Sequence, residues 1–166
     1  RGGTFEKKDP TDLNRVARSV VALSQHALAK ATERFSLRLC DGIPEVAGDR
    51  IGLEQVVLNL LQNACQALPD RSRGISVATS FDAAARSVVL EVRDEGVGIE
   101  PEGLRRLTEA FYTTKRETGG TGLGLSISAR IVREHGGSLS FASQPGRGTT
   151  ATVRLPALEG RETRYS

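Results

Sequence analysis

Residues 88–98 read VVLEVRDEGVG, an alternating segment that ends in a carboxylate and two glycines. Val88, Leu90 and Val92 occupy alternate positions, which predicts a strand with one buried face. Asp94 is the next residue on that face, where a carboxylate is costly unless a partner hydrogen-bonds it. The two glycines beyond it would let a flat ligand approach the backbone. Two interpretations stay open: an aspartate that caps a turn, or a carboxylate that accepts a hydrogen bond from a ligand amino group.

Further helices and strands are predicted on both sides of this segment. The expected helices run from 13 to 31, from 49 to 68, from 101 to a glycine-rich loop at 111–120, and from 123 to 136, and the expected strands cover 35–39, 75–81, 88–92, 139–141 and 151–155. Turns near 82–86 and 145–146 make two hairpins. We therefore expect one α+β domain, a two-layer α/β sandwich with helices on one face of a mixed, mostly antiparallel sheet.

The composition fits a single globular domain and argues against several other classes of protein. The chain has 166 residues, 38% of them hydrophobic and 26% charged, which suffices for a core without disulfides or metals. No apolar run approaches the roughly 20 residues of a membrane span. The net charge of +3 is scattered, so we expect no nucleic acid partner and no membrane contact. Cys40 and Cys65 lack CxxC spacing, which favours reduced thiols and a cytoplasmic location.

Two counts in the composition are unusual, namely 18 glycines and no methionine. The missing methionine suggests that the chain is a piece of a longer protein. We expect a tail from an upstream module at residues 1–8, the domain itself at 9–156, and a polar C-terminal tail at 157–166.

A second departure from simple patterning lies on the helix that begins after Asp49. At about 100° per residue, Asn59, Asn63 and Gln66 fall on one strip at the edge of the apolar arc. Amide oxygens can ligate Mg²⁺, which usually keeps several waters and substrate phosphates. The alternative is a structural asparagine ladder to a neighbouring loop. Glu54 projects away from this strip, and we leave it outside the predicted site.

A third departure is the run GGTGLGL at residues 119–125, which leads directly into a helix. Backbone N–H groups and the dipole at a helix N-terminus suit phosphate oxygens. The run is not a P-loop, because no Lys-Ser or Lys-Thr follows a glycine at the required spacing, and it is not a Rossmann fingerprint, because it follows no strand. Together, the three departures predict a nucleotide site.

Five motifs in a fixed order resemble the catalytic ATP-binding domain of bacterial sensor histidine kinases, within the superfamily shared with gyrase, a heat-shock chaperone and mismatch-repair ATPases. They are an N box at 54–64, a first glycine box at 94–99, a phenylalanine box at 111–115, a second glycine box at 119–125 and a glycine-threonine element at 146–149. The resemblance runs from about residue 13 to 155 and implies a Bergerat-type ATP-binding fold. The threonine-rich lid is most similar to that of the nitrogen- and oxygen-sensor branch.

The resemblance implies a role for each part of the site. Asp94 would accept the adenine amino group, Thr149 would support it through water, and Asn63 would help to coordinate Mg²⁺. Residues 101–120 would form a mobile lid, in which Lys115 either reaches a phosphate or stays solvated. The full set implied for ATP comprises Asn59, Asn63, Gln66, Asp94, Gly96, Gly98, Ile99, Lys115, Thr121, Gly122, Leu123, Gly124, Leu125 and Thr149, with Asn63 as the metal ligand.

Two positions depart from the family pattern. Gln66 stands where many members carry a basic residue, so phosphate neutralisation would depend on Lys115 or Arg116. Asn59 stands where the ATP-hydrolysing relatives carry a glutamate base. Without that carboxylate, water activation should be poor, which favours phosphoryl transfer over hydrolysis. We assign no catalytic residue within this chain.

Neither histidine has the sequence context of a phosphate acceptor, and we expect His26 and His135 to be structural or surface residues. The resemblance therefore implies transfer from ATP·Mg²⁺ to a histidine on an upstream dimerisation domain of a homodimeric parent, which would be soluble or membrane-anchored and would pass the phosphate to a response regulator. Two alternatives stay open, namely a regulatory nucleotide-binding module without turnover and an ATPase of the same superfamily.

Overall fold

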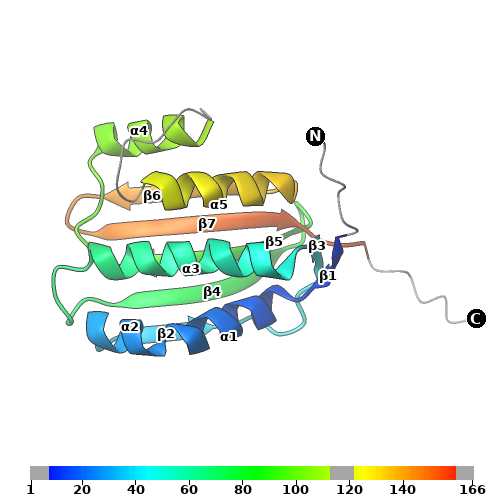
Figure 1. Cartoon of the computed structure of the whole chain (residues 1–166), viewed down its shortest axis with the longest axis horizontal. Coiled ribbons are helices and arrows are strands. Elements are labelled where there is room, and N and C mark those ends of the chain that lie inside the picture. Colours follow the sequence, from blue (N-terminus) through cyan, green and yellow to red (C-terminus); the bar gives the residue numbers. More distant parts are fainter. Residues whose placement is uncertain (1–7, 113–121, 160–166) are drawn as a thin grey trace, which may run out of the picture.

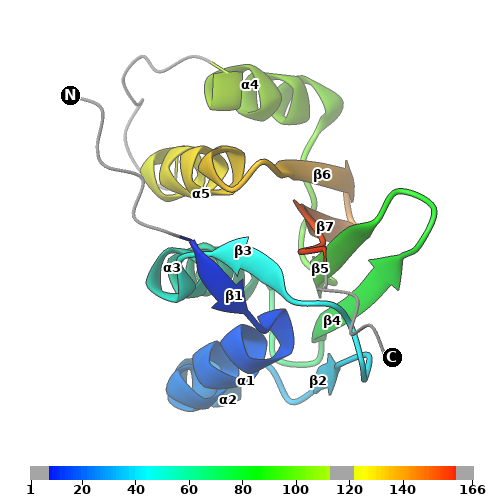
Figure 2. The same cartoon turned by 90° about the vertical axis from the view of Figure 1, so that its right-hand side faces the viewer.

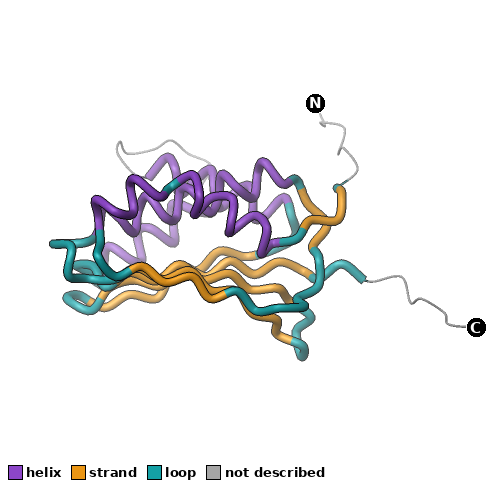
Figure 3. The backbone as a smooth tube through the Cα atoms, turned by 90° about the horizontal axis from the view of Figure 1, so that it is seen from below, coloured by secondary structure: helices purple, strands orange, loops and turns teal. Residues whose placement is uncertain are grey.

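The helices and strands form two layers, with the described helices on one side of a five-stranded sheet (Figures 1 and 3). This computed structural model describes residues 8–112 and 122–159. In chain order the elements are β1 (Asp9–Thr11), α1 (Leu13–Leu23), α2 (Gln25–Ala31), β2 (Phe35–Arg38), β3 (Val46–Gly48), α3 (Arg50–Ala67), β4 (Ile75–Asp82), β5 (Ser87–Asp94), α4 (Pro101–Tyr112), α5 (Gly122–Glu134), β6 (Ser138–Gln144) and β7 (Gly148–Pro156).

The main sheet has the strand order β2-β4-β5-β7-β6. Strand β2 pairs with β4 in parallel, and the other three pairings are antiparallel. Strands β1 and β3 form a separate antiparallel pair, which lies beside the N-terminal ends of α1 and α3 (Figure 2). The predicted α+β sandwich, with a mixed sheet and helices on one face, is therefore confirmed.

The core lies between the helices and the inward face of the sheet. Val88, Leu90 and Val92 of β5 are at most 2% exposed, as their alternation predicts. Leu90 lies directly opposite Val153 of β7, and both belong to one cluster that includes Leu60 of α3. Fully burying each such side chain contributes roughly 1.5–3 kcal/mol. The central strand β5 thus fixes both the sheet and the depth at which its last residue, Asp94, is buried.

One expected helix is two helices. The segment 13–31 divides into α1 and α2 at Ser24, whose backbone φ and ψ are −96° and 4°. The N–H of Ser24 donates to the carbonyl oxygens of both Val20 and Val21, at 2.9 and 3.1 Å. Serine is a weaker helix former than alanine or leucine. The side chain of Ser24 is itself buried, so the period of buried positions continues across the break and periodicity alone does not reveal it.

Two short strands and the end of one helix also differ from the sequence-based expectation. Strands β1 and β3 were not predicted, because three residues are too few for an alternating pattern to be recognised. Their pairing includes a hydrogen bond from the Thr11 hydroxyl to the Gly48 carbonyl oxygen, at 3.2 Å. Helix α4 also continues to Tyr112, so residues 111 and 112 belong to a helix and not to the expected loop.

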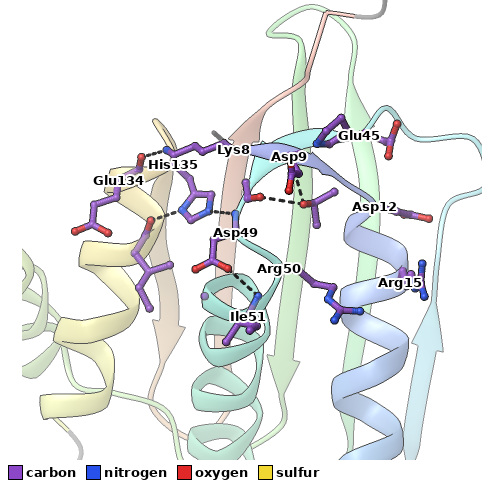
Figure 4. Close-up of a pocket in the computed structure, with 15 residues that line it drawn as sticks. Lys8, Asp9, Asp12, Arg15, Glu45, Asp49, Arg50, Ile51, Glu134 and His135 are labelled. Carbon is purple, nitrogen blue, oxygen red and sulfur yellow. Dashed lines mark hydrogen bonds between the residues drawn. The ribbon is translucent and has the colours of Figure 1, made fainter. Parts of the chain in front are cut away.

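His135 joins the C-terminal end of α5 to the N-terminal end of α3 (Figure 4). Its Nε2 accepts a hydrogen bond from the backbone N–H of Asp49, at 2.9 Å, and its Nδ1 lies 2.7 Å from the carbonyl oxygen of Ile131. A carbonyl can only accept, so the tautomer that makes both bonds carries its proton on Nδ1. The imidazole is 8% exposed, which agrees with the expected structural role.

We predict that His135→Ala lowers the free energy of unfolding by about 1–3 kcal/mol, because it leaves the Asp49 N–H and the Ile131 carbonyl without this partner. Urea denaturation followed by circular dichroism measures the effect. The matched control is His26→Ala on the exposed surface of α2, where we expect a change within about 0.5 kcal/mol. Equal free energies of unfolding for the two variants would show that the hydrogen bonds of His135 do not stabilise the fold.

Candidate functional site

A cavity of about 270 Å³ lies between the helical layer and the ends of the central strands. Small-molecule sites usually hold roughly 300–1,000 Å³, so this cavity suits a base-sized group and not a whole nucleotide. Its lining comes from α3 (Leu60, Asn63, Ala64, Gln66, Ala67), β5 (Val92, Asp94), the loop after β5 (Gly98, Ile99), α4 (Leu107), α5 (Leu125), β6 (Phe141) and β7 (Thr149, Ala151). Among these lining residues, Asp94 has the only ionisable side chain.

The carboxylate of Asp94 is 6% exposed and is held at the last position of β5. Its Oδ1 accepts a hydrogen bond from the backbone N–H of Gly96, at 2.9 Å. Burial raises the pKa of Asp94 above its ordinary value, and hydrogen bonds from the backbone N–H groups of Gly96 and Thr149 partly offset that rise in pKa. A carboxylate offers about four lone-pair positions, so two backbone donors leave it able to accept from a ligand in the cavity.

Thr149 lies directly opposite Asp94, on the neighbouring strand β7. The residue before it, Gly148, has a φ of +110°, a backbone conformation that side chains strongly disfavour. A Cβ atom at Gly148 would also lie 2.0 Å from the carbonyl oxygen of Asp94. Glycine at this position therefore lets β7 approach β5 closely enough for the backbone N–H of Thr149 to hydrogen-bond the Asp94 carboxylate.

The loop after β5 is held between α3 and the turn that joins β6 to β7. The N–H of Val97 donates to the carbonyl oxygen of Ala67 at 3.0 Å, and its carbonyl oxygen accepts from the N–H of Gly146 at 2.8 Å. Gly98 has a φ of +75°, and a Cβ there would lie 2.1 Å from the carbonyl oxygen of Gln144. These contacts place Gly98 and Ile99 in the cavity wall.

The three amides of α3 differ in position. Asn63 and Gln66 line the cavity, and no described residue hydrogen-bonds the side chain of Asn63. Asn59 does not line it. The Oδ1 of Asn59 accepts from Gln55 at 2.8 Å, and its Nδ2 donates to the Gly124 carbonyl at 3.1 Å and the Ser128 hydroxyl at 3.0 Å. Asn59 therefore bridges α3 to α5, whereas Asn63 and Gln66 are the amides that a ligand in the cavity can reach.

The first turn of α5 lies at the rim of this cavity. Leu125 is a lining residue, and the Asn59 bridge to Gly124 fixes the position of this turn. Gly122 is the first residue of the helix, whereas the side chain of Leu123 lies outside the described residues. Lys115 and Thr121 also lie outside the described residues, as does the part of the expected lid that follows α4.

The cavity residues that sequence reasoning missed are Leu60, Ala64, Ala67, Val92, Leu107, Phe141 and Ala151. Most of these belong to the hydrophobic core or pack against it, so the apolar periodicity that predicted the core also identifies them. Nothing local in the sequence shows which part of the core stays unfilled. Leu107 comes from α4, a contact that depends on how that helix folds back over the sheet.

Two larger cavities contain none of the expected nucleotide residues. One, of about 820 Å³, is lined by charged residues around His135 that include Lys8, Asp49 and Glu134 (Figure 4). The other, of about 630 Å³, lies on the outer side of the sheet between residues such as Arg38 and Arg93. Within the described ranges there is no cluster of three or more His, Cys, Asp or Glu side chains suited to a metal, and no helix combines the length and the apolar character needed to cross a bilayer.

Comparison with known proteins identifies the family and the fold. Residues 48–159 match the family described as "Histidine kinase-, DNA gyrase B-, and HSP90-like ATPase". Sporulation kinase E of Bacillus subtilis is 34% identical over 160 residues, which cover 96% of this chain and 21% of that kinase. NtrB of Azospirillum brasilense, a sensory histidine kinase/phosphatase, is 36% identical over 166 residues, which cover 92% of this chain and 40% of NtrB. The solved catalytic domain of the histidine kinase ThkA has a TM-score of 0.76 at 27% identity, covering 90% of this chain and 97% of that domain.

The chain therefore belongs to the family of histidine kinase-, DNA gyrase B- and HSP90-like ATPases. Within this family it is an ATP-binding catalytic domain of the histidine kinase kind, as its sensor kinase relatives and the ThkA structure show. The resemblance carried by the five motifs is confirmed. The chain spans between about a seventh and two fifths of the length of the curated relatives that it matches.

The raised pKa of Asp94 predicts how stability depends on pH. In the folded protein Asp94 keeps its proton at pH values where the unfolded chain has lost it. Its stabilising contribution is therefore complete below the unfolded pKa and is lost as the pH rises through the folded pKa. We expect Asp94→Asn, compared with the unchanged chain, to become relatively more stable as the pH rises across this window.

Urea denaturation of both proteins across the acid range measures this difference, with Asp70→Asn as the control of opposite sign. Hydrogen bonds from Ser72 lower the pKa of Asp70, so that carboxylate stabilises the fold above its unfolded pKa and this contribution is lost as the pH falls. Asp70→Asn should therefore become relatively less stable as the pH rises. The same trend in both variants would contradict the assigned burial of Asp94.

Proposed function

We propose that this domain binds ATP together with Mg²⁺ and transfers the γ-phosphoryl group to a histidine on a separate dimerisation domain. The observation that carries the proposal is the position of Asp94, a buried hydrogen-bond acceptor in the wall of a base-sized cavity. The amide of Asn63, which no described residue hydrogen-bonds, and the first turn of α5 lie at the same cavity, which supports a ligand that continues from a base into phosphates.

Adenine fits the inner part of this cavity by its chemistry. Its exocyclic amino group is a donor that Asp94 can accept, and the ring can pack between apolar walls that include Leu60 and Phe141. Gly98 and Ile99 form the adjacent backbone surface. We assign Asp94 and Thr149 to recognition of the amino group, and Gly98 and Ile99 to the adenine slot.

The triphosphate has to lie outside a cavity of about 270 Å³, towards α5 and the amide of Asn63. Helix α5 begins at the rim, and the backbone N–H groups and dipole at a helix N-terminus favour phosphate oxygens. The amide oxygen of Asn63 suits Mg²⁺, which takes oxygen ligands and is usually held by one or two protein groups plus phosphates and water. Bound Mg²⁺ would neutralise phosphate charge, and Asn63 would orient it. Residues 115 and 121–124 complete the proposed phosphate contacts.

The environment of Asn59 favours transfer of the γ-phosphoryl group over hydrolysis of ATP. It occupies the position where the resemblance implies a glutamate base in the hydrolysing relatives, and its amide is engaged by Gln55, Gly124 and Ser128. An amide cannot take a proton from water, so attack by water gains no general base from this position. Phosphoryl transfer depends mainly on positioning and charge stabilisation, which the proposed site can supply to an incoming histidine.

The acceptor histidine is proposed to come from another domain. Both ring nitrogens of His135 are engaged in the bridge between α5 and α3, so this side chain is not available for phosphorylation. We further propose a homodimeric parent whose phosphohistidine supplies a response regulator, and a cytoplasmic location, with which the two free cysteines agree. The similarity to NtrB supports membership of the nitrogen-sensor branch.

Nucleotide affinity separates the two parts of the site. We predict that Asp94→Ala weakens ATP binding about tenfold to more than a hundredfold, with or without Mg²⁺, because a hydrogen bond to a charged group is lost. Asn63→Ala should weaken binding about three- to tenfold only when Mg²⁺ is present. Isothermal titration calorimetry measures both. Glu91→Gln, on the exposed face of the same strand as Asp94, is the matched control and should bind normally. Unchanged affinity in Asp94→Ala would overturn the adenine assignment.

The transfer itself is tested by incubating the chain with labelled ATP, Mg²⁺ and the dimerisation domain of a relative. We expect acid-labile, base-stable phosphohistidine on the added domain, and the same amount with His26→Ala. ATP binding without any phosphohistidine would favour a regulatory module. Steady phosphate release by the chain alone would favour an ATPase.

A further inference from the structure

Three polar side chains share the helix-facing side of three neighbouring strands at one end of the sheet. Asp94 of β5 lies opposite Thr149 of β7, and Thr149 lies opposite Ser143 of β6. Asp94 and Thr149 line the 270 Å³ cavity, whereas Ser143 is not among its lining residues. Ser143 is half-buried behind Thr149, on the side away from the carboxylate.

The hydroxyl of Ser143 makes three hydrogen-bonding contacts. It accepts from the backbone N–H of Ile99 at 2.8 Å, lies 3.0 Å from the carbonyl oxygen of Gly148, and lies 2.8 Å from the hydroxyl oxygen of Thr149. A serine hydroxyl has one proton and two lone pairs. A carbonyl can only accept, so the Ser143 proton points to Gly148. Both lone pairs then accept, one from Ile99 and the other from Thr149.

Only this arrangement satisfies all three contacts, and it fixes the direction of the Thr149 proton. The Thr149 hydroxyl donates to Ser143, away from the cavity, so its oxygen presents lone pairs to a ligand. The ionised Asp94 carboxylate beside it also presents only lone pairs. The wall formed by these two residues is therefore an acceptor surface, which matches a primary amino group with two N–H donors and repels a carbonyl oxygen.

We propose that Ser143 is a positioning residue that sets the preference of this site for an amino-purine over an oxo-purine nucleotide, acting through the Thr149 hydroxyl. The proposal rests on the proposed function, in which the purine enters the cavity beside Asp94. Without Ser143, the Thr149 hydroxyl can rotate and point its proton into the cavity. It could then donate a hydrogen bond to the carbonyl oxygen of an oxo-purine. The site would still bind a purine nucleotide, but it would distinguish the two kinds less well.

The test measures dissociation constants for ATP and for inosine triphosphate, which carries an oxygen in place of the adenine amino group. We expect Ser143→Ala to lower the preference for ATP over inosine triphosphate about three- to tenfold, which is the size of one neutral hydrogen bond. Ser143→Thr keeps the hydroxyl and should restore the preference. Ser140→Ala lies on the outward face of the same strand and should leave the preference unchanged.

A double-mutant cycle identifies the route of the effect. If Ser143 acts through Thr149, then Thr149→Val alone should also lower the preference, and adding Ser143→Ala to it should change the preference no further. Equal weakening of both nucleotides in Ser143→Ala, or an undiminished effect in the Thr149→Val background, would overturn the proposal.

Failure of this proposal is distinguishable from failure of the proposed function. Asp94→Asn is the reference variant, because replacing the carboxylate must reduce the preference if the purine amino group lies there. If the unchanged chain prefers ATP and Asp94→Asn loses that preference while Ser143→Ala retains it, only the role of Ser143 is wrong. If Asp94→Asn also retains the preference for ATP, the assignment of the adenine site is wrong, and the proposed role of Ser143 is wrong as well.

Discussion

Burying the carboxylate of Asp94 requires hydrogen-bond donors that a core of valine and leucine does not contain. The fold provides them from the backbone, through the N–H of Gly96 at 2.9 Å and through strand β7, which approaches closely because Gly148 has no side chain. The loop after β5 and the end of β7 are therefore shaped around one charged group. Without a ligand, this arrangement disfavours the ionised form of Asp94, because burial of the carboxylate raises its pKa.

The helical layer determines what else can reach that carboxylate. Asn59 uses its amide to join α3 to the first turn of α5, which places the N-terminal end of α5 at the cavity rim. Asn63, one turn further along α3, lines the cavity and has no described hydrogen-bond partner. Two asparagines that look equivalent in sequence thus differ in use, because one supports the position of a helix and the other is open to a ligand.

The sequence predicts the part of this structure that follows from periodicity. Alternation along β5 locates the inward face, and the same reasoning makes Asp94 conspicuous on it. Applied to β6, where Leu139 and Phe141 precede Ser143 on the same face, this rule would have singled out Ser143 as well. The break at Ser24 could not be predicted, because the buried serine keeps the helical period intact. The partners of Asn59 on α5 could not be predicted either, because they lie 65 and 69 positions away in the chain.

In the proposed function, the purine amino group lies against Asp94, in the small cavity between α3 and the ends of the strands. A crystal structure of the chain with a non-hydrolysable ATP analogue and Mg²⁺ tests it most directly. We expect the adenine amino nitrogen about 3 Å from a carboxylate oxygen of Asp94, with the phosphates beside the first turn of α5. A base bound in the charged cavity around His135, or one whose amino group faces solvent, would show that Asp94 does not recognise the purine.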